Sequence, residues 1–176
     1  LVSLNARDAV QRGAVVLTRT RVTSATRMGD LWEVVTEGPN GTHTHTARAL
    51  VNAGGPWVED VIRNVVRINT AEGVRLVRGS HIVTRKLYDH DRCYFFQGTD
   101  GRIIFAIPYE QDFTLIGTTD QDHQGAPGEV ACTDGGRDYL LDFASRYFAK
   151  SVTAEDVVWT YSGVRPLYND GAKSAT

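Results

Sequence analysis

Two kinds of spacing between apolar positions alternate along the chain, and each predicts a different element. Apolar residues three or four positions apart predict a helix over 1–12, with Gly13 as its C-terminal stop. Val- and Thr-rich segments then predict three strands, at 14–25, 31–37 and 42–53. Short turns containing glycine separate these strands, so we expect a three-stranded antiparallel meander that must pack on something else.

The second half of the chain reads as strands interrupted by helical segments. A helix is predicted over 56–64, directly after Gly54-Gly55, and another over 136–150. The remaining strands are predicted at 73–85, 93–97, 102–109, 113–118 and 156–161. The turn at Asp100-Gly101 joins two strands rich in aromatic residues and isoleucine, which favours an antiparallel sheet. The fold class is therefore mixed α/β, of the α+β kind, with a boundary near residues 65–72.

Composition and charge exclude several classes of function. The 176 residues carry 19 Lys and Arg against 21 Asp and Glu, a formal net charge of −2, and the basic residues are scattered. A nucleic-acid partner is therefore not expected. No apolar run approaches the length of a membrane span. Cys93 and Cys132 show no metal or disulfide spacing, and His43 and His45 favour a solvated strand face over a metal site.

The segment 51–57 ends a strand in small residues and opens a helix. Such a turn lets a ligand approach the backbone closely and points free N–H groups at it. A tight turn that binds nothing is an equally good interpretation of the spacing alone. The dinucleotide fingerprint GxGxxG is absent from the chain.

Two other strand ends carry chemically useful side chains. His81 follows a glycine in the Arg78-Gly79-Ser80-His81 segment, and glycine in a strand often marks a close approach of ligand or backbone. Arg165 has no acid adjacent in sequence, so it could clamp a carboxylate or phosphate. The alternatives are a hydrogen-bonded core histidine and a surface salt bridge. Asp120, in the segment 117–120, offers a carboxylate or simply caps a turn.

No catalytic motif of the hydrolases or kinases occurs, so the residues alone indicate a mixed α/β domain with glycine-lined strand ends. Seven ordered segments, taken together, resemble the flavin-dependent glycerol-3-phosphate dehydrogenases of the D-amino-acid-oxidase-like group. They are Leu4 to Asp8, Leu17 to Val22, Val51 to Trp57, Val74 to Val83, Phe105 to Tyr109, Leu115 to Asp120, and Val157 to Leu167.

The resemblance implies FAD as cofactor and an organisation in three parts. Residues 1–66 would belong to the FAD-binding region, 67–160 to a substrate-binding antiparallel sheet with its helix, and 161–176 would return toward the FAD site. Enzymes of this family begin with a GxGxxG loop, so the chain looks like an internal piece of a longer enzyme. Alone it is expected to hold little FAD and to show no turnover.

The resemblance also assigns roles to individual residues. His81 and Arg165 would be catalytic, and Arg165 with Thr119 would bind substrate. The residues expected to line the cofactor are Val22, Ala53, Gly54, Trp57 and Gly163. No metal is implied.

The implied reaction oxidises sn-glycerol 3-phosphate to dihydroxyacetone phosphate and passes the electrons through FAD to a quinone. His81 would take the hydroxyl proton or stabilise the alkoxide, and Arg165 would supply positive charge. The enzyme would be cytoplasmic, with possible peripheral contact at the cell membrane. Two alternatives stay open: another flavoprotein of this group acting on an amino or hydroxy acid, and a non-catalytic binding module.

Overall fold

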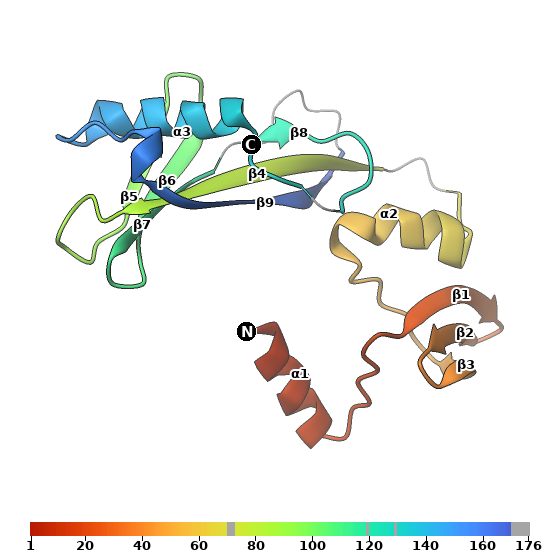
Figure 1. The fold of residues 1–176 in the computed structure, drawn as a ribbon. Coiled ribbons are helices and arrows are strands. Elements are labelled where there is room, and N and C mark those ends of the chain that lie inside the picture. The colour runs from red at the N-terminus through yellow and green to blue at the C-terminus, as the bar shows by residue number, and fades with distance from the viewer. Residues whose placement is uncertain (70–72, 119, 129, 170–176) are drawn as a thin grey trace. The chain divides into compact units, whose positions relative to one another are not determined.

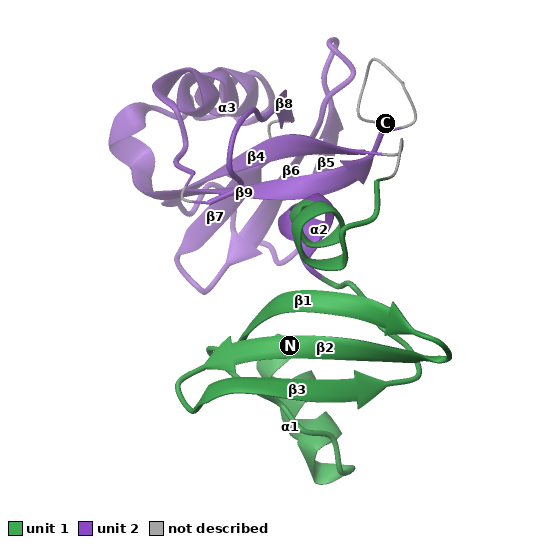
Figure 2. Ribbon diagram, turned by 90° about the vertical axis from the view of Figure 1, so that its right-hand side faces the viewer, with its two compact units in different colours: residues 1–53, 60–69 green, residues 54–59, 70–176 purple. Residues whose placement is uncertain are grey.

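The computed structural model describes residues 1–69, 73–118, 120–128 and 130–169. These residues form two compact units. Unit 1 contains residues 1–53 and 60–69, and unit 2 contains residues 54–59 with the chain from residue 70 onward (Figure 2). The three-part organisation implied by the resemblance stays a prediction.

Unit 1 consists of helix α1 (Val2–Gln11) and a three-stranded sheet. The strands β1 (Arg21–Met28), β2 (Leu31–Gly38) and β3 (Gly41–Ala47) pair antiparallel in chain order (Figure 2). This arrangement confirms the predicted helix and the predicted meander. The two turns contain Gly29 and Gly41, both with positive φ, as tight hairpin connections require.

Two of the predicted strands of unit 1 are shorter than expected. The prediction of a strand from residue 14 is wrong because β1 begins only at Arg21, after Arg19 adopts a φ of 53°, which breaks the extended backbone. The prediction that the third strand reaches residue 53 is also wrong. Ala47 pairs with Trp32, near the start of β2, so residues after Ala47 have almost no β2 backbone left to pair with.

The predicted helix after Gly54-Gly55 is present but irregular. A 3₁₀ turn η1 (Gly55–Trp57) leads into a single α-helical turn α2 (Val58–Asp60) and a π-helical segment η2 (Val61–Val66). Pro56 lies in the first turn, where its missing N–H costs nothing. The segment ends where Arg67 adopts a left-handed conformation.

Unit 2 is built around an antiparallel sheet of six strands (Figure 1). Its strands are β4 (Val74–Arg85), β5 (Tyr94–Gln97), β6 (Ile103–Tyr109), β7 (Phe113–Gly117), β8 (Gln121–Asp122) and β9 (Val157–Tyr168). Their order is β5-β6-β7-β4-β8, and β9 pairs with β4. The sheet confirms the antiparallel architecture; the short β8 was not predicted.

Strand β9 continues seven residues beyond its predicted end at Tyr161. Gly163 and Pro166 resemble strand breakers in sequence, yet both lie within the pairing with β4. Pro166 is tolerated because β9 pairs with β4 and lies at the edge of the sheet, where a missing N–H is not needed. The long β4–β9 ribbon, from Val74 opposite Tyr168 to Thr84 opposite Val157, is therefore the largest pairing of the unit.

One face of this sheet is covered by helix α3 (Asp134–Tyr147), as Figure 1 shows. Thr133 caps the helix, because its hydroxyl accepts a hydrogen bond from the Gly136 N–H, so the helix starts at Asp134, two residues earlier than predicted. Leu140 and Phe143 pack onto Ile82 and other buried strand residues. The core of unit 2 therefore lies between α3 and the even-numbered positions of β4.

The opposite face of the sheet presents large apolar side chains to the outside. The strand register places these side chains at alternating positions, on the same face as His81 and Gly117. They are Phe95, Ile103, Phe105, Trp159 and Tyr161, each between 37% and 60% exposed. We call this the outer face. Contiguous exposed aromatic surface of this kind marks a place where something binds.

Neighbouring isoleucines on β6 test this assignment of faces. Ile104 is 0% exposed and Ile103 is 41% exposed. We expect Ile104→Ala to lower the free energy of unfolding by about 2–5 kcal/mol, because it leaves a cavity against α3. Ile103→Ala should cost clearly less. Urea unfolding of the 176-residue chain, followed by tryptophan fluorescence, measures both; equal losses would contradict the two-faced sheet.

Candidate functional site on the outer face

His81 occupies the middle of β4, between two neighbouring strands. Gly117 of β7 lies opposite it on one side and Tyr161 of β9 on the other. Its imidazole stacks on the Tyr161 ring, with centroids 4.8 Å apart and an angle of 5° between the planes. On the other side a Cβ on Gly117 would lie 2.2 Å from the His81 Cδ2 atom. The imidazole therefore fills space that only a glycine leaves free.

The electrostatics of His81 favour its neutral form. Partial burial lowers its pKa below 6.5, the Arg165 guanidinium lowers it further, and the Asp120 carboxylate opposes them. Its Nδ1 atom is buried and has no hydrogen-bond partner in the described part of the chain. A neutral imidazole can accept a proton, and an unpartnered buried nitrogen is the kind of group that a ligand satisfies.

Arg165 does have an acidic partner, contrary to the expectation from its sequence neighbours. Its guanidinium donates a hydrogen bond to the Asp120 carboxylate, which comes from the link between β7 and β8. The two residues are 45 positions apart, so no local sequence pattern indicates the pair. Arg165 remains half exposed, so the guanidinium keeps donors available for a ligand.

Two further arginine contacts hold the segment that carries Asp120. Gln121 accepts a hydrogen bond from Arg78 at 2.7 Å, and Asp122 accepts one from Arg75 at 2.6 Å. Both arginines belong to β4, to which β8 is paired. The position of the Asp120 carboxylate is therefore set by the same strand that carries His81.

A row without side chains separates His81 from Arg165. Gly79 and Gly163 pair directly across β4 and β9, between the row of His81 with Tyr161 and the row of Val77 with Arg165. These outer rows are four residues apart along each strand, about 13 Å at the usual rise. A Cβ on Gly163 would meet no atom within 4 Å. Gly163 is therefore open to a small molecule, whereas Gly79 is buried.

The small-residue turn predicted to line the cofactor lies in part beside this glycine row. Gly54 and Trp57 belong to unit 2, and the 3₁₀ turn η1 packs against β9. Val22 and Ala53 belong to unit 1 and are both exposed. Thr119, predicted to bind substrate, lies outside the described residues. The structure therefore brings together His81, Arg165 and Gly163 on one face, with the turn at Gly54 and Trp57 nearby.

The outer face has the features that a flavin ring requires. A planar aromatic ring needs a flat and apolar surface. Gly163 offers backbone without a side chain, Tyr161 lies in the next row, and Trp159 and Phe105 extend the apolar surface further along the same face. The His81 ring lies beside Gly163 on this face, and its buried Nδ1 atom has no hydrogen-bond partner among the described residues. The residues present therefore fit FAD.

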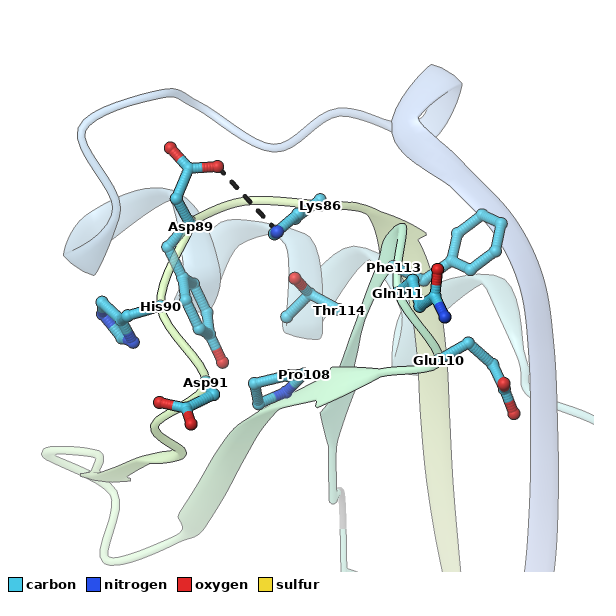
Figure 3. A pocket seen from close by; sticks show the side chains of 10 residues that line it. Lys86, Asp89, His90, Asp91, Pro108, Glu110, Gln111, Phe113 and Thr114 are labelled. Atoms are coloured by element: carbon cyan, nitrogen blue, oxygen red, sulfur yellow. Dashed lines mark ion pairs between the residues drawn. The ribbon is translucent and has the colours of Figure 1, made fainter.

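Two other hollows lie away from His81 and Arg165, and we do not assign a reaction to either. One, of about 150 Å³, is lined by residues of β6, β7 and the segment after β4, including Lys86, Tyr88 and Asp89 (Figure 3). The Tyr88 hydroxyl donates to the Ala106 carbonyl, and burial raises its pKa to about 12, so it stays protonated. The other hollow, of about 460 Å³, lies within unit 1 beside Thr36.

His43 and His45, whose spacing raised the question of a metal, bond to other protein groups. His45 Nε2 lies 3.0 Å from the Thr36 hydroxyl, and His43 Nε2 lies 3.1 Å from the Asn40 carbonyl. Within the described ranges, no three His, Cys, Asp or Glu side chains gather as metal ligands would.

Cys93 and Cys132 are both free thiols. In the part of the chain that the structure describes, no helix is long and apolar enough to cross a membrane.

The lowered pKa of His81 predicts a pH dependence of stability. The unfolded chain binds a proton at His81 more readily than the folded chain, so unfolding becomes easier as pH falls below about 6.5. We expect the melting temperature of the 176-residue chain to fall between pH 7 and pH 5. His81→Gln should flatten this slope. An equal slope in wild type and His81→Gln would contradict the assignment.

Comparisons with known proteins identify the family of the chain. The chain matches the FAD dependent oxidoreductase family over residues 1–174. It is 45% identical over 171 residues to the glycerol-3-phosphate dehydrogenase of Pseudomonas tolaasii, covering 97% of this chain and 33% of that protein. It is 46% identical over 173 residues to the D-erythritol 1-phosphate dehydrogenase of Brucella abortus, covering 97% and 34%.

A solved structure gives the same result for the fold. The glycerol-3-phosphate dehydrogenase of Bacillus halodurans, complexed with FAD, superimposes with a TM-score of 0.80 at 34% identity, covering 94% of this chain and 34% of that one. The chain thus spans about a third of the length of these relatives. Because the family match extends over nearly all of its residues, the chain belongs to the FAD-dependent oxidoreductases, as its sequence motifs indicated.

Proposed function

We propose that the chain supplies the substrate-facing wall of an FAD-dependent dehydrogenase that oxidises sn-glycerol 3-phosphate to dihydroxyacetone phosphate. The observation that carries the proposal is the placement of His81 and Arg165 on one face, at either end of a bare glycine row. A proton acceptor and a fixed positive charge beside an open stretch of backbone are what the oxidation of an anionic alcohol needs. The names of relatives in Pseudomonas tolaasii and Bacillus halodurans support this substrate.

His81 acts as the proton acceptor. The carbinol C–H bond breaks with its electron pair, the O–H proton passes to the imidazole, and a C=O bond forms. FAD, when bound, supplies the two-electron acceptor for the departing hydride. The neutral imidazole is the form able to take the proton, and its burial and the nearby guanidinium keep it neutral at physiological pH.

Arg165 stabilises the negative charge that develops on the substrate oxygen or holds the phosphate. Its planar guanidinium presents several donors in a fixed arrangement, and the Asp120 carboxylate holds it in place by engaging one of them. Thr119 remains a proposed substrate contact. Gly163, with Gly54 and Trp57, would line the flavin, as would Val22 and Ala53 from unit 1.

A second polyol phosphate is supported by a different relative. The D-erythritol 1-phosphate dehydrogenase of Brucella abortus is 46% identical, as similar as the glycerol-3-phosphate dehydrogenases. Both substrates are phosphorylated polyols with an oxidisable carbinol, so the same His81 and Arg165 chemistry serves either. The rates at which the two polyol phosphates reduce the flavin separate these two candidate substrates. If an amino acid reduced the flavin faster than either, it would be the better substrate and both proposals would fail.

The electrons would pass from the flavin to a quinone, at a peripheral contact of the full-length protein with the cytoplasmic face of the membrane. This part of the proposal rests on the resemblance to the aerobic enzymes. Reduction of a soluble quinone analogue after flavin reduction, and sedimentation with vesicles, would test the two parts separately.

The catalytic assignment predicts large losses in two variants of the full-length, FAD-loaded protein. His81→Gln should slow flavin reduction by roughly 10²–10⁴-fold, because the proton acceptor is lost. Arg165→Lys should slow it strongly too, because an ammonium cannot reproduce the planar donor arrangement. Stopped-flow bleaching of the flavin with sn-glycerol 3-phosphate measures both. His123→Gln is the control, and a His81→Gln variant as fast as wild type would end the assignment.

We expect a substitution at Gly163 to weaken FAD or substrate binding without affecting the folding of the chain. A Cβ on Gly163 meets no atom of the chain, so Gly163→Ala should fold with a nearly unchanged melting temperature. In the FAD-loaded protein the same methyl group would enter the space above the backbone at Gly163. We expect reduced FAD content or a raised KM, measured by flavin absorbance and steady-state kinetics. Normal values of both would show that nothing lies over Gly163.

A further inference from the structure

The His81 imidazole is confined on both of its flat sides. A Cβ on Gly117 would lie 2.7 Å from His81 Cγ and 2.8 Å from Nε2, so the ring lies directly over the bare backbone of β7. The Tyr161 ring covers the other side, nearly parallel at 4.8 Å. Both neighbours are fixed by the strand register, which places Gly117 and Tyr161 opposite His81.

The closeness of the His81 ring explains why position 117 is occupied by a glycine. Gly117 lies inside the sheet, where a glycine normally weakens a strand. Any larger side chain would overlap the imidazole, because real Cβ atoms do not approach ring carbons to 2.2 Å. A side chain at position 117 would therefore push the imidazole out of its present orientation.

Tyr161 also contacts a second aromatic ring. Trp159, two residues earlier on β9, lies with its ring 5.3 Å from the Tyr161 ring. Burial raises the pKa of the Tyr161 phenol, with a smaller effect from Tyr109, so the hydroxyl is protonated at neutral pH. Tyr161 thus presents a neutral aromatic face to His81.

We propose that Tyr161, acting with the bare backbone at Gly117, is a positioning residue that fixes the orientation of the His81 imidazole for proton transfer. This inference rests on the proposed function, in which His81 takes the hydroxyl proton. Stacking between two flat surfaces removes the rotation about the Cβ–Cγ bond that would turn the ring away. A general base displaced by about 1 Å loses roughly 10²-fold in rate, so this restraint matters for the chemistry.

The surroundings of the imidazole also include charged groups. Two charged groups face the imidazole from the neighbouring elements, Arg165 of β9 and Asp120 from the β7–β8 link. They oppose each other in their effect on the pKa of His81.

The Tyr161 hydroxyl could instead be a proton donor in its own right, and one substitution separates these roles. Tyr161→Phe keeps the ring and removes the hydroxyl, whereas Tyr161→Ser removes the ring and leaves only a short alcohol that does not reach the position of the phenol. Gly117→Ala disturbs the other side of the imidazole. Tyr168→Ser is the matched control, because Tyr168 lies on the same strand, is 66% exposed, and pairs with Val74 rather than His81.

The variants are compared in the full-length, FAD-loaded protein with sn-glycerol 3-phosphate. Tyr161→Ser and Gly117→Ala should each slow flavin reduction at saturating substrate by roughly 10²-fold with little change in KM or FAD content. Tyr161→Phe and Tyr168→Ser should stay near wild type. A large loss in Tyr161→Phe would overturn the positioning role and assign the hydroxyl to the chemistry.

NMR of ¹³C-labelled histidine gives a readout independent of activity, with His81→Gln used to assign the His81 signal. We expect ring contacts between His81 and residue 161 in wild type and in Tyr161→Phe. In Tyr161→Ser the His81 titration midpoint should move up toward 6.5, because burial lowers it in wild type. If wild type reduces no flavin with polyol phosphates, the proposed function fails, while these signals still decide whether Tyr161 orients His81. An unchanged His81 signal in Tyr161→Ser would overturn the inference.

Discussion

The pairing of β4 with β9 is the constraint on which the candidate site depends. It joins residues about eighty positions apart in sequence, and its register decides which side chains share a face. His81, Gly163 and Arg165 belong to one set of alternating positions, and Ser80, Ile82 and Ser162 belong to the other. A slip of one residue in β9 would send Arg165 and Tyr161 to the side of α3, away from His81.

This register is held from the covered face. Ile82 packs in the core beneath α3, and the Ser80 and Ser162 hydroxyls lie 2.8 Å apart across the same pair of strands. Burial of apolar side chains there is strongly favourable, and slippage would expose them. The outer face can therefore hold a bare glycine row and a partly buried histidine, both of which cost stability. Packing on one side of the sheet supports the chemistry on the other.

Much of this arrangement could be predicted from the sequence, and the features that could not be predicted have physical causes. Period-2 patterns and glycine turns predicted the meander, β4 to β7 and the helix α3, because these depend on local chemistry. The ends of β1 and β3 were wrong because a backbone torsion at Arg19 and the length of β2 set them. The Asp120–Arg165 pair and the stack of His81 on Tyr161 depend on register between distant strands, which no local pattern reports.

One signal for Tyr161 was nonetheless present. In Tyr161-Ser162-Gly163-Val164-Arg165 the tyrosine and arginine are four residues apart, so any strand through this segment puts them on the same face. Reading the segment as a strand end, because of its glycine and proline, concealed that relation.

The glycine row also constrains how substrates could be told apart. The rows of His81 and Arg165 lie about 13 Å apart along the backbone, and the Arg165 side chain reaches close enough to act on the pKa of His81. The carbinol and the phosphate are common to glycerol and erythritol phosphates, so contacts to these groups bind both alike. A carbon unit alone is worth only about 1–3 kcal/mol in a pocket, whereas an extra hydroxyl is selected by a polar group that must bond it. Selection between glycerol and erythritol phosphates therefore depends on whether a hydrogen-bonding group lies near the end of the longer chain. Gly79 and Gly163 have no side chains, so they do not favour either substrate.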